Sequence, residues 1–372
     1  MNFIIKKELL LENLNNVSKA ISNKNIIPIL GGVKLDLSEE GLYLTCSDNE
    51  ITIRSFIEKK DIEKINNKGS IVIIGRYFIE LIRKIPSDLI EIITDGLNLT
   101  ISTINGEYNL NGMNPDEFPD KSLELSKNLI KIDKNVIKNI INQTSFAISN
   151  QESRPILTGI NFKIKDRIIE CVATDSYRLS KKIINIEEKI DEEVNLVIPG
   201  RNLIELSKII NEENEKIEMH IFSNNVLFKF DNIIFQSRLL NGNYPDTSKL
   251  IIIEPTLKIK VNTEDLYNAI DRASLLTSEK DKNVINMEIK DKEVVISSTS
   301  QEIGKIEERI IVEKDNNVLL NISYSSKYMM EALRTIKSEY TSILLSGEIK
   351  PIILKSTEED NLIQLIVPIK TF

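Results

Sequence analysis

The residues that could carry out catalysis are few. Among 372 residues the chain has one histidine, His220, and two cysteines, Cys46 and Cys171. It lacks a glycine-rich phosphate loop, a Gly-x-Gly-x-x-Gly sequence and a His-Glu-x-x-His sequence. His220 lies in an alternating pattern typical of a strand, which favours a solvated or hydrogen-bonded histidine over a catalytic one. A transition-metal site would have to consist of carboxylates alone, so we expect no metal, no cofactor and no catalytic residue.

Most carboxylates occur in runs that are typical of solvated surface, such as 187–188, 191–193 and 358–360. Asp48 and Asp175 differ, because each follows an expected strand and the two lie 127 positions apart. A short acceptor in this position caps a turn by accepting bonds from backbone N–H groups. We therefore expect both to be structural. A carboxylate-dependent hydrolase is the alternative, which metal-dependent turnover abolished by replacing Asp175 would support.

Cys46 and Cys171 come shortly before these two aspartates, so they belong to different copies of a repeat. Reduced thiols in two cores are expected, without a disulfide. No stretch approaches the roughly 18 apolar residues of a membrane span, and no targeting segment is apparent. The sequence thus predicts a soluble, cytoplasmic protein with no membrane partner.

One unit is repeated along the chain. Pro28-Ile29-Leu30 and Ser47-Asp48 recur 127 positions later as Pro155-Ile156-Leu157 and Thr174-Asp175. The 372 residues of the chain exceed the about 250–300 residues of a single core, so more than one domain is expected. A repeat period near 125 residues is too long for a solenoid and indicates tandem domains. Each copy combines two helices with several strands, so the fold class is α+β. The expected domains are 1–122, 129–252 and 255–372.

Hydrophobic spacing gives the expected elements. The helices are predicted at Lys6–Ile21, Gly75–Ile85, Asp133–Ser149, Gly200–Ile210, Thr263–Leu276 and Ser326–Lys337. The strands are predicted at Val33–Leu37, Leu42–Thr45, Ile51–Ile57, Ser70–Ile74, Glu91–Thr94, Leu97–Ile101, Tyr108–Asn111, Asn195–Pro199, Leu319–Ser323, Ile343–Leu345, Ile352–Leu354 and Leu362–Val367.

Charge is distributed unevenly. The chain has a net charge of −8, which alone argues against a nucleic-acid partner, yet the six expected helices carry +5 and leave −13 elsewhere. If the helices share a surface, that surface is basic and could contact phosphates without reading sequence. Merely solvated helix exteriors are the alternative. The cations concerned are Arg76, Arg83, Lys84, Arg201, Lys208, Lys327, Arg334 and Lys337.

The copies differ directly after the repeated aspartate. Asn49-Glu50-Ile51 in the first becomes Ser176-Tyr177-Arg178 in the second. Tyrosine and arginine are enriched in binding hot spots, although an accident of core or surface would also explain the change. The C-terminus is apolar through 365–372, where chains usually fray into polar tails. We expect this end to be docked or to form part of a groove.

Together, the motifs at 155–159, 173–179, 241–246 and 367–372, with their order and the threefold repeat, resemble the bacterial DNA polymerase III beta subunit family, the sliding clamps. The resemblance covers the whole chain. It implies a DNA-clamp fold of three domains, each with two helices packed on antiparallel sheets. It also implies a head-to-tail homodimer that closes a six-domain ring, with helices lining the hole.

The function that the resemblance implies is processivity without catalysis. A clamp encircles double-stranded DNA independently of sequence and tethers the DNA polymerase III alpha subunit to it. The clamp loader, other polymerases and repair proteins bind through short peptides. A monomeric adaptor that binds peptides but not DNA is the alternative, which a monomer mass in solution would favour.

The family's site residues transfer to this chain by position. The implied partner groove is lined by Leu157, Thr174, Ser176, Tyr177, Arg178, Leu179, Pro245, Lys249, Leu250, Tyr324, Val367, Pro368, Ile369 and Lys370. Implied DNA contacts are Lys24, Arg76, Arg83, Gln151, Arg154, Arg201 and Arg272. The implied dimer seam pairs Tyr108 and Leu110 with Leu275 and Leu276. The family often has Gly-His at Ser176-Tyr177 and a basic residue at Ser248, so peptide preference is expected to differ.

Overall fold

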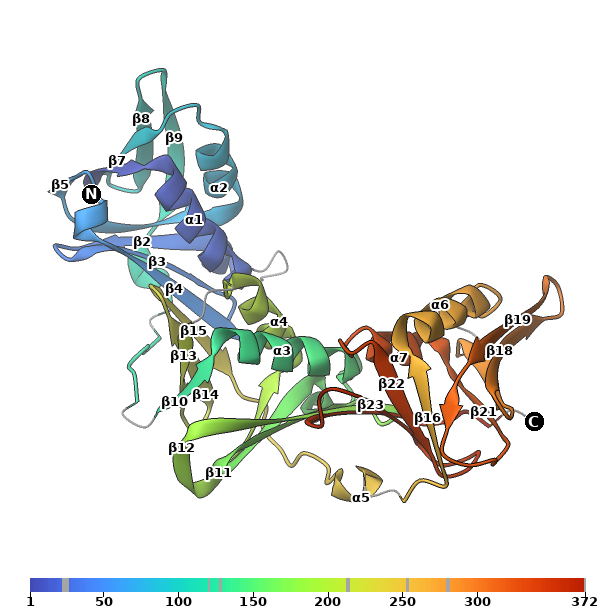
Figure 1. Cartoon of the computed structure of the whole chain (residues 1–372). Helices are drawn as coiled ribbons and strands as arrows, with labels where there is room; N and C mark the ends of the chain where they lie inside the picture. The colour runs from blue at the N-terminus through green and yellow to red at the C-terminus, as the bar shows by residue number, and fades with distance from the viewer. Residues whose placement is uncertain are drawn as a thin grey trace. The chain divides into compact units, whose positions relative to one another are not determined.

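The computed structural model describes residues 1–21, 27–119, 121–126, 129–211, 215–251, 254–278 and 282–370. The chain forms two compact units. Unit 1 comprises Met1–Asn135 and Glu205–Leu239, and unit 2 comprises Val136–Ile204 and Leu240–Phe372. Each is treated by itself below (Figure 1).

Unit 1 is built on one antiparallel sheet with the strand order β10-β13-β14-β15-β4-β3-β2-β6-β9-β8-β7-β1-β5. Strand β4 of the first repeat pairs with β15 of the second, with Ile51 opposite Ser237. The strands are β1 (Asn2–Lys6), β2 (Gly32–Leu37), β3 (Gly41–Ser47), β4 (Ile51–Glu58), β5 (Lys64–Asn67), β6 (Gly69–Ile74), β7 (Leu89–Asp95), β8 (Asn98–Thr103), β9 (Gly106–Met113), β10 (Leu129–Asp133), β13 (Lys216–Ile221), β14 (Asn225–Phe230) and β15 (Ile233–Arg238).

Helices α1 (Lys7–Val17) and α2 (Gly75–Lys84) pack against each other and against this sheet (Figure 1). The α1 side chains Leu10, Leu14 and Val17 recur at helical spacing and are fully buried. A polar contact fixes the same face, since Ser55 of β4 donates a hydrogen bond to Asn13. The opposite face of β2, β3 and β4 is thus turned away from α1.

Unit 2 contains two antiparallel sheets, ordered β11-β12-β24-β23-β22-β16-β20 and β19-β18-β17-β21. Strand β12 of the second repeat pairs with β24 of the third, as β4 pairs with β15 in unit 1. The strands are β11 (Gly159–Thr174), β12 (Arg178–Pro199), β16 (Leu257–Asn262), β17 (Val284–Ile289), β18 (Glu293–Ser300), β19 (Gly304–Ile311), β20 (Glu313–Lys314), β21 (Leu320–Ser325), β22 (Tyr340–Leu345), β23 (Ile352–Ser356) and β24 (Leu362–Ile366).

Helices α6 (Thr263–Ser274) and α7 (Ser326–Leu333) lie next to each other in unit 2 (Figure 1). Asn262 caps α6, because its side chain accepts hydrogen bonds from the N–H groups of Glu264 and Asp265. Leu266, Ile270 and Leu333 bury the shared apolar face in the main core of this unit. The chain also has α3 (Lys134–Thr144), α4 (Gly200–Ile209) and the short α5 (Ser248–Ile251).

The α+β prediction is confirmed, and all strand pairs among the described residues are antiparallel. Helix ends differ most: α7 stops at Leu333 instead of Lys337, because the chain tightens into turns in which Thr335 donates to Ala332 and Ile336 to Leu333. Strands β1 and β5 and helix α5 are among the elements that hydrophobic spacing did not predict. The domain limits 1–122, 129–252 and 255–372 stay predictions.

The repeat is visible in backbone geometry. Asp48 accepts hydrogen bonds from the N–H groups of Glu50 and Ile51, and the intervening Asn49 has φ +76°. Both aspartates therefore cap turns as predicted, since the Asp175 turn, described below, has the same form. Asn49 tolerates the left-handed backbone comparatively well.

The remaining candidate reactive groups are buried. His220 is 1% exposed and one ring nitrogen, Nδ1, lies 2.9 Å from the backbone oxygen of Ser126. It is hydrogen-bonded, which is one of the two predicted alternatives, and it is not solvated.

Cys46 and Cys171 are free and buried, and burial raises the pKa of both thiols. No helix in the described parts of the chain is both long and apolar enough to cross a membrane.

Candidate functional site

Ser176 and Tyr177 are exposed at the tip of the Asp175 turn of unit 2. Asp175 Oδ1 accepts hydrogen bonds from the N–H groups of Tyr177, at 2.9 Å, and Arg178, at 3.0 Å. Thr174 Oγ1 accepts from the N–H of Ser176 and donates to the carbonyl of Arg178. Ser176 has φ +78°, matching Asn49 in the first repeat. These bonds fix the backbone and leave the Tyr177 side chain 61% exposed.

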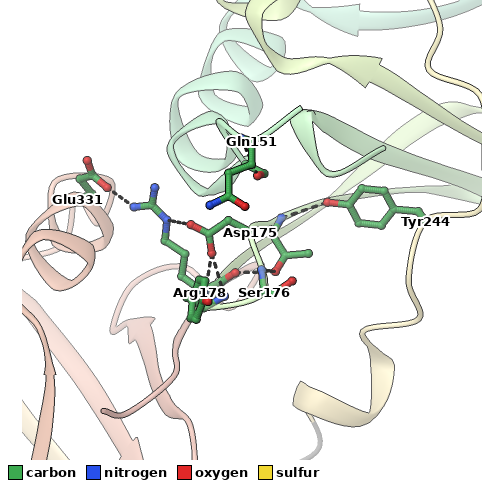
Figure 2. Close-up of polar contacts among 9 residues, drawn as sticks. Gln151, Asp175, Ser176, Arg178, Tyr244 and Glu331 are labelled. Atoms are coloured by element: carbon green, nitrogen blue, oxygen red, sulfur yellow. Dashed lines mark hydrogen bonds and ion pairs between the residues drawn. The ribbon is translucent and has the colours of Figure 1, made fainter. Parts of the chain in front are cut away.

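Arg178 points inward instead of lining an open surface. Its Nε donates to Asp175 Oδ2 at 3.0 Å, and Nη1 pairs with Glu331 of α7 (Figure 2). The guanidinium also lies over the rings of Phe146 and Tyr328, 5.3 and 4.4 Å from their centroids. The side chain is 7% exposed. In this conformation the guanidinium is held by Asp175 and Glu331, and the groove-lining role expected for Arg178 stays a prediction.

A cleft of about 400 Å³ lies beside this arginine. Gln151, Tyr177, Lys327 and Tyr328 border it together with Arg178. Gln151 lies above the Asp175 turn in Figure 2. Burial raises the pKa of the Tyr328 hydroxyl, and the nearby Asp175 acts in the same direction. The cleft thus joins a predicted DNA contact, Gln151, to the predicted groove residue Tyr177.

A separate apolar cluster lies where β12 meets β24, with Leu179 opposite Leu365 in the register. We call it the outer cluster. Its buried members are Val172, Leu179, Ile353 and Leu365, and Tyr244, Ile251, Leu344 and Ile363 pack against them.

Tyr244 ties this cluster to the Asp175 turn, because its hydroxyl accepts a hydrogen bond from the N–H of Thr174 at 3.0 Å (Figure 2). Burial raises the pKa of that hydroxyl, so it stays neutral. Thr174 and Leu179, both predicted and both buried, therefore lie beside Tyr244, which was not among the predicted site residues.

The C-terminal segment docks beside the turn, as expected. Val367 donates its N–H to the carbonyl of Tyr177 at 2.9 Å, and Ile369 donates to the carbonyl of Ser323 at 2.8 Å. Val367 keeps 37% of its surface exposed. Pro368 is half-buried and Lys370 is exposed, while residues 371–372 lie outside the described residues. Backbone bonds thus hold this segment beside the Asp175 turn.

The predicted groove residues Pro245, Lys249 and Leu250 lie on the segment that contains α5. All three are exposed, and Leu250 is 48% exposed. Ile251, at the end of α5, packs on the outer cluster. This contact brings the segment to the cluster that contains Leu179.

Tyr324 does not belong to this surface. It is fully buried in the main core of unit 2, and its hydroxyl faces Met287 Sδ at 3.9 Å. The expectation that Tyr324 contacts a partner is therefore wrong for this structure, because the core covers the whole side chain. Leu157 is also buried, at 4% exposure, and its backbone bonds join it to Ser149 and Arg154.

The predicted DNA contacts differ in how free their charges are. Arg76 and Arg201 are exposed and form no ion pair within the described structure. Arg154 is exposed and lies 3.5 Å from the Ser176 hydroxyl. Gln151 is also exposed.

Arg83, by contrast, pairs with Glu80 and donates a hydrogen bond to Asn15. Lys24 lies outside the described residues.

Arg272 is the least available of the predicted DNA contacts that the structure describes. Its Nε and Nη2 atoms donate to the two carboxylate oxygens of Glu308, at 2.9 and 2.8 Å. The hydrogen bond to Arg272 lowers the pKa of Glu308, so the carboxylate stays charged. A bidentate pair of this kind cancels the positive charge that was expected to face phosphate.

Positive charge on the helices is smaller than predicted. Within the bounds of the structure, the six longer helices carry a net charge of +2 instead of +5. The observed helices are shorter than the predicted ones. They leave out one acidic residue, Asp133, and four basic residues, Lys6, Lys19, Arg334 and Lys337. Lys134, at the start of α3, is fully buried and cannot reach a phosphate.

The predicted seam residues carry apolar surface in the single chain. Leu275 is 75% exposed directly after α6, and Leu276 is half-buried. Tyr108 and Leu110 are half-buried on one face of β9. Sequence reasoning missed Ile104 beside them, which is 97% exposed, and Ile311 on β19, which is 87% exposed.

Other functional candidates were missed for different reasons. Tyr244 stands 126 positions after Phe118, so a comparison of the repeats could have flagged its added hydroxyl. The sequence does not indicate that Glu331 and Tyr328 contact Arg178, because these contacts join positions about 150 apart.

Comparison with known proteins accounts for the repeat. Models of the DNA polymerase III beta subunit match along the chain: the N-terminal domain at residues 1–123, the central domain at 131–246 and the C-terminal domain at 249–370. The beta sliding clamp of Bacillus subtilis is 41% identical and that of Staphylococcus aureus 40%, with 100% of each chain covered in both cases.

Solved structures of sliding clamps resemble this chain over its whole length. The sliding clamp of Bacillus subtilis superposes with a TM-score of 0.96 at 39% identity, and the DNA polymerase III beta chain of Streptococcus pneumoniae with 0.95 at 34%. Both comparisons cover 100% of both chains. The chain belongs to the family of the DNA polymerase III beta subunit, the beta sliding clamps.

Proposed function

We propose that this member of the sliding clamp family works as a head-to-tail homodimer that encircles duplex DNA and holds DNA polymerase III on it. The chain serves replication as a processivity factor, and it has no catalysis of its own in this proposal. Location in the cytoplasm and the domain limits 1–122, 129–252 and 255–372 belong to the same proposal.

The observation that carries the ring is the exposed apolar surface at two distant places in the sequence. Ile104 and the half-buried Leu110 adjoin β9 in the first repeat, and Leu275 and Ile311 lie in the third. Among the described strands, residues 106–111 of β9 pair only with β8, and β19 pairs only with β18. Unpaired strand edges with apolar side chains favour pairing with another chain.

Such pairing suits a heterologous contact, in which the first repeat of one copy meets the third repeat of the other. Two contacts of this kind close a ring of six domains. A closed ring retains DNA by topology, so the contacts to phosphate can stay weak and sequence-blind. The proposed contacts are Lys24, Arg76, Gln151, Arg154 and Arg201, with Arg83 and Arg272. The last two contribute less, because each is held by a carboxylate.

The partner groove is the second part of the proposal. The outer cluster forms its floor, with the Asp175 turn on one side and residues 367–370 on another. Short peptides of the polymerase alpha subunit, the clamp loader, other polymerases and repair proteins would place apolar side chains there. Tyr177, Leu250 and Val367 supply exposed apolar surface at its rim.

Retention on circular DNA tests the ring. The protein is loaded by its clamp loader with ATP onto nicked circular duplex, and the DNA-bound fraction is isolated by gel filtration. We expect the protein to stay on the circle and to be lost once a restriction enzyme makes the DNA linear. Equal retention on circular and linear DNA would exclude encirclement.

A further inference from the structure

A basic cleft in unit 1 has no place in the proposed function. Three outward residues in register form its floor: Lys34 on β2 lies opposite Thr45 on β3, which lies opposite Arg54 on β4. Phe118 and Pro119 stand beside it as a wall. The cleft has a volume of about 290 Å³. It opens on the face of the sheet turned away from α1.

Its charge is one-sided. Lys34, Arg54 and Lys121 border the cleft, and Asp36 is the one carboxylate among its lining residues. Within the described parts of the chain, none of the three cations forms an ion pair with a carboxylate. All three are half-buried. The cleft thus gathers three cations without a carboxylate partner among the described residues, on a chain with a net charge of −8.

The contacts that these cations do make hold them around the cleft. Arg54 donates from Nε to Thr45 Oγ1 at 3.3 Å, and its Cζ lies 5.7 Å from the centroid of the Tyr43 ring. Its two terminal nitrogens have no hydrogen-bond partner among the described residues. Lys121 donates to the backbone carbonyl of Asn49 at 3.1 Å, which leaves donors of its ammonium group unused.

Burial and the neighbouring charges act in opposite directions on the pKa of Lys121. Burial lowers the pKa of this ammonium group, and Arg238 acts in the same direction, whereas Asp48 and Glu50 oppose the shift. A cation that is partly desolvated without a carboxylate partner loses free energy. An anion in the cleft would restore that loss.

We propose that this cleft binds the phosphate group of a small anionic ligand. Arg54 offers the four N–H donors of its two terminal nitrogens in a fixed plane, and Lys34 and Lys121 supply point charges. This arrangement suits an oxyanion carrying two charges and several acceptor oxygens better than a single carboxylate. Two sources share this chemistry, an inorganic phosphate or pyrophosphate and the phosphates of a nucleotide. Encircled DNA is not the ligand. In the proposed ring the helices face the DNA, and the cleft lies on the face of the sheet opposite to α1.

Calorimetric titration of the full chain with pyrophosphate at constant ionic strength tests the proposal. Saturable binding is expected, weakened at least tenfold by Arg54→Gln and by Lys34→Gln. Arg167→Gln, at an exposed arginine of β11, is the matched control and should bind as the unchanged chain does. Tighter binding of ADP than of pyrophosphate would identify a nucleotide as the ligand, and equal binding would identify the inorganic anion.

Three outcomes would overturn the proposal. They are no binding by the unchanged chain, unchanged binding by both cleft variants while circular dichroism shows them folded, and binding of citrate as tight as that of pyrophosphate. Retention on circular DNA is measured in parallel and should not change in Arg54→Gln. A loss there would assign the cleft to DNA instead.

Discussion

The guanidinium carbon of Arg178 lies 4.4 Å from the centre of the Tyr328 ring, although the two residues belong to different sequence repeats. The same guanidinium pairs with Asp175 and Glu331. One buried cation therefore fastens the Asp175 turn, whose tip carries Ser176 and Tyr177, to helix α7. The shape of the proposed groove at this turn depends on a contact outside the groove.

Replacing Arg178 by methionine should destabilise the protein by about 3 kcal/mol, because Asp175 and Glu331 would lose a buried partner. Urea denaturation followed by circular dichroism measures the loss. Arg309→Met is the control, since Arg309 is 61% exposed and its ion pairs lie at the surface. Equal losses in the two variants would show that Arg178 does not fasten the turn.

Lys134 is a second buried cation, and its removal should destabilise unit 1 by about 3 kcal/mol at neutral pH. Its ammonium group is fully buried and donates to Asp231 at 2.7 Å, Glu215 at 3.0 Å and Asn211 at 3.0 Å. Burial lowers the pKa of Lys134, but the bonds to Asp231 and Glu215 outweigh it, so the pKa is raised. Its stabilising effect is thus complete at neutral pH and is lost only as the pH rises through that raised pKa.

The pH dependence of Lys134→Met gives a sharper check. Burial raises the pKa of Asp231 even with the lysine present. Without the lysine its carboxylate should protonate more readily still, so the variant should lose less stability at pH 5 than at pH 7. Unfolding free energies at the two pH values decide this. A difference from the unchanged chain that grows on acidification would contradict the assigned charges.

Much of the fold could be predicted because the sequence repeats itself. The offset of 127 residues pairs Asp48 with Asp175, and both side chains cap turns of the same form. Hydrophobic spacing places the longer helices, since α1, α2 and α6 bury one apolar face each. Helix ends are harder to predict, because the last turns of a helix are decided by local hydrogen bonds that spacing does not reveal.

The site was harder to predict, because burial and pairing are tertiary properties. Tyr324 fits a groove by its position but fills a core, and Arg272 carries a charge that Glu308 cancels. Arg178 stands out in the sequence as special to the second repeat, yet its partner Glu331 lies 153 positions away. No periodicity connects residues at that separation.

The arginines proposed to contact DNA should contribute unequally. Arg76→Gln should lower the slope of log affinity against log salt concentration by about 1, since an exposed, unpaired arginine can neutralise one phosphate. Arg272→Gln should change the slope less, because Glu308 already holds its charge. Fluorescence anisotropy with a labelled duplex over a salt series measures both. A larger effect of Arg272→Gln would mean that its ion pair opens on binding.

The docked C-terminal segment leads to a prediction about the groove. Val367→Ala combined with Ile369→Ala should weaken binding of a polymerase alpha-subunit peptide by tenfold or more. Only side-chain surface is removed, because the segment is held by backbone bonds to Tyr177 and Ser323. Calorimetry with the peptide gives the affinity, and light scattering gives the oligomeric state. Loss of the dimer in this variant would contradict the separation of groove from seam.

The exposed leucines after α6 test the seam. Leu275→Asp with Leu276→Asp should give folded monomers, because pairing with Tyr108 and Leu110 of a second copy would bury two uncompensated charges. Light scattering after gel filtration should show the mass of one chain in place of two. Ile349→Asp is the control, since Ile349 is also apolar and 65% exposed but lies outside the proposed seam. A dimer that survives the double change, or one that is lost with Ile349→Asp, would place the interface elsewhere. Monomers that also fail to stay on circular DNA would connect the seam to ring closure.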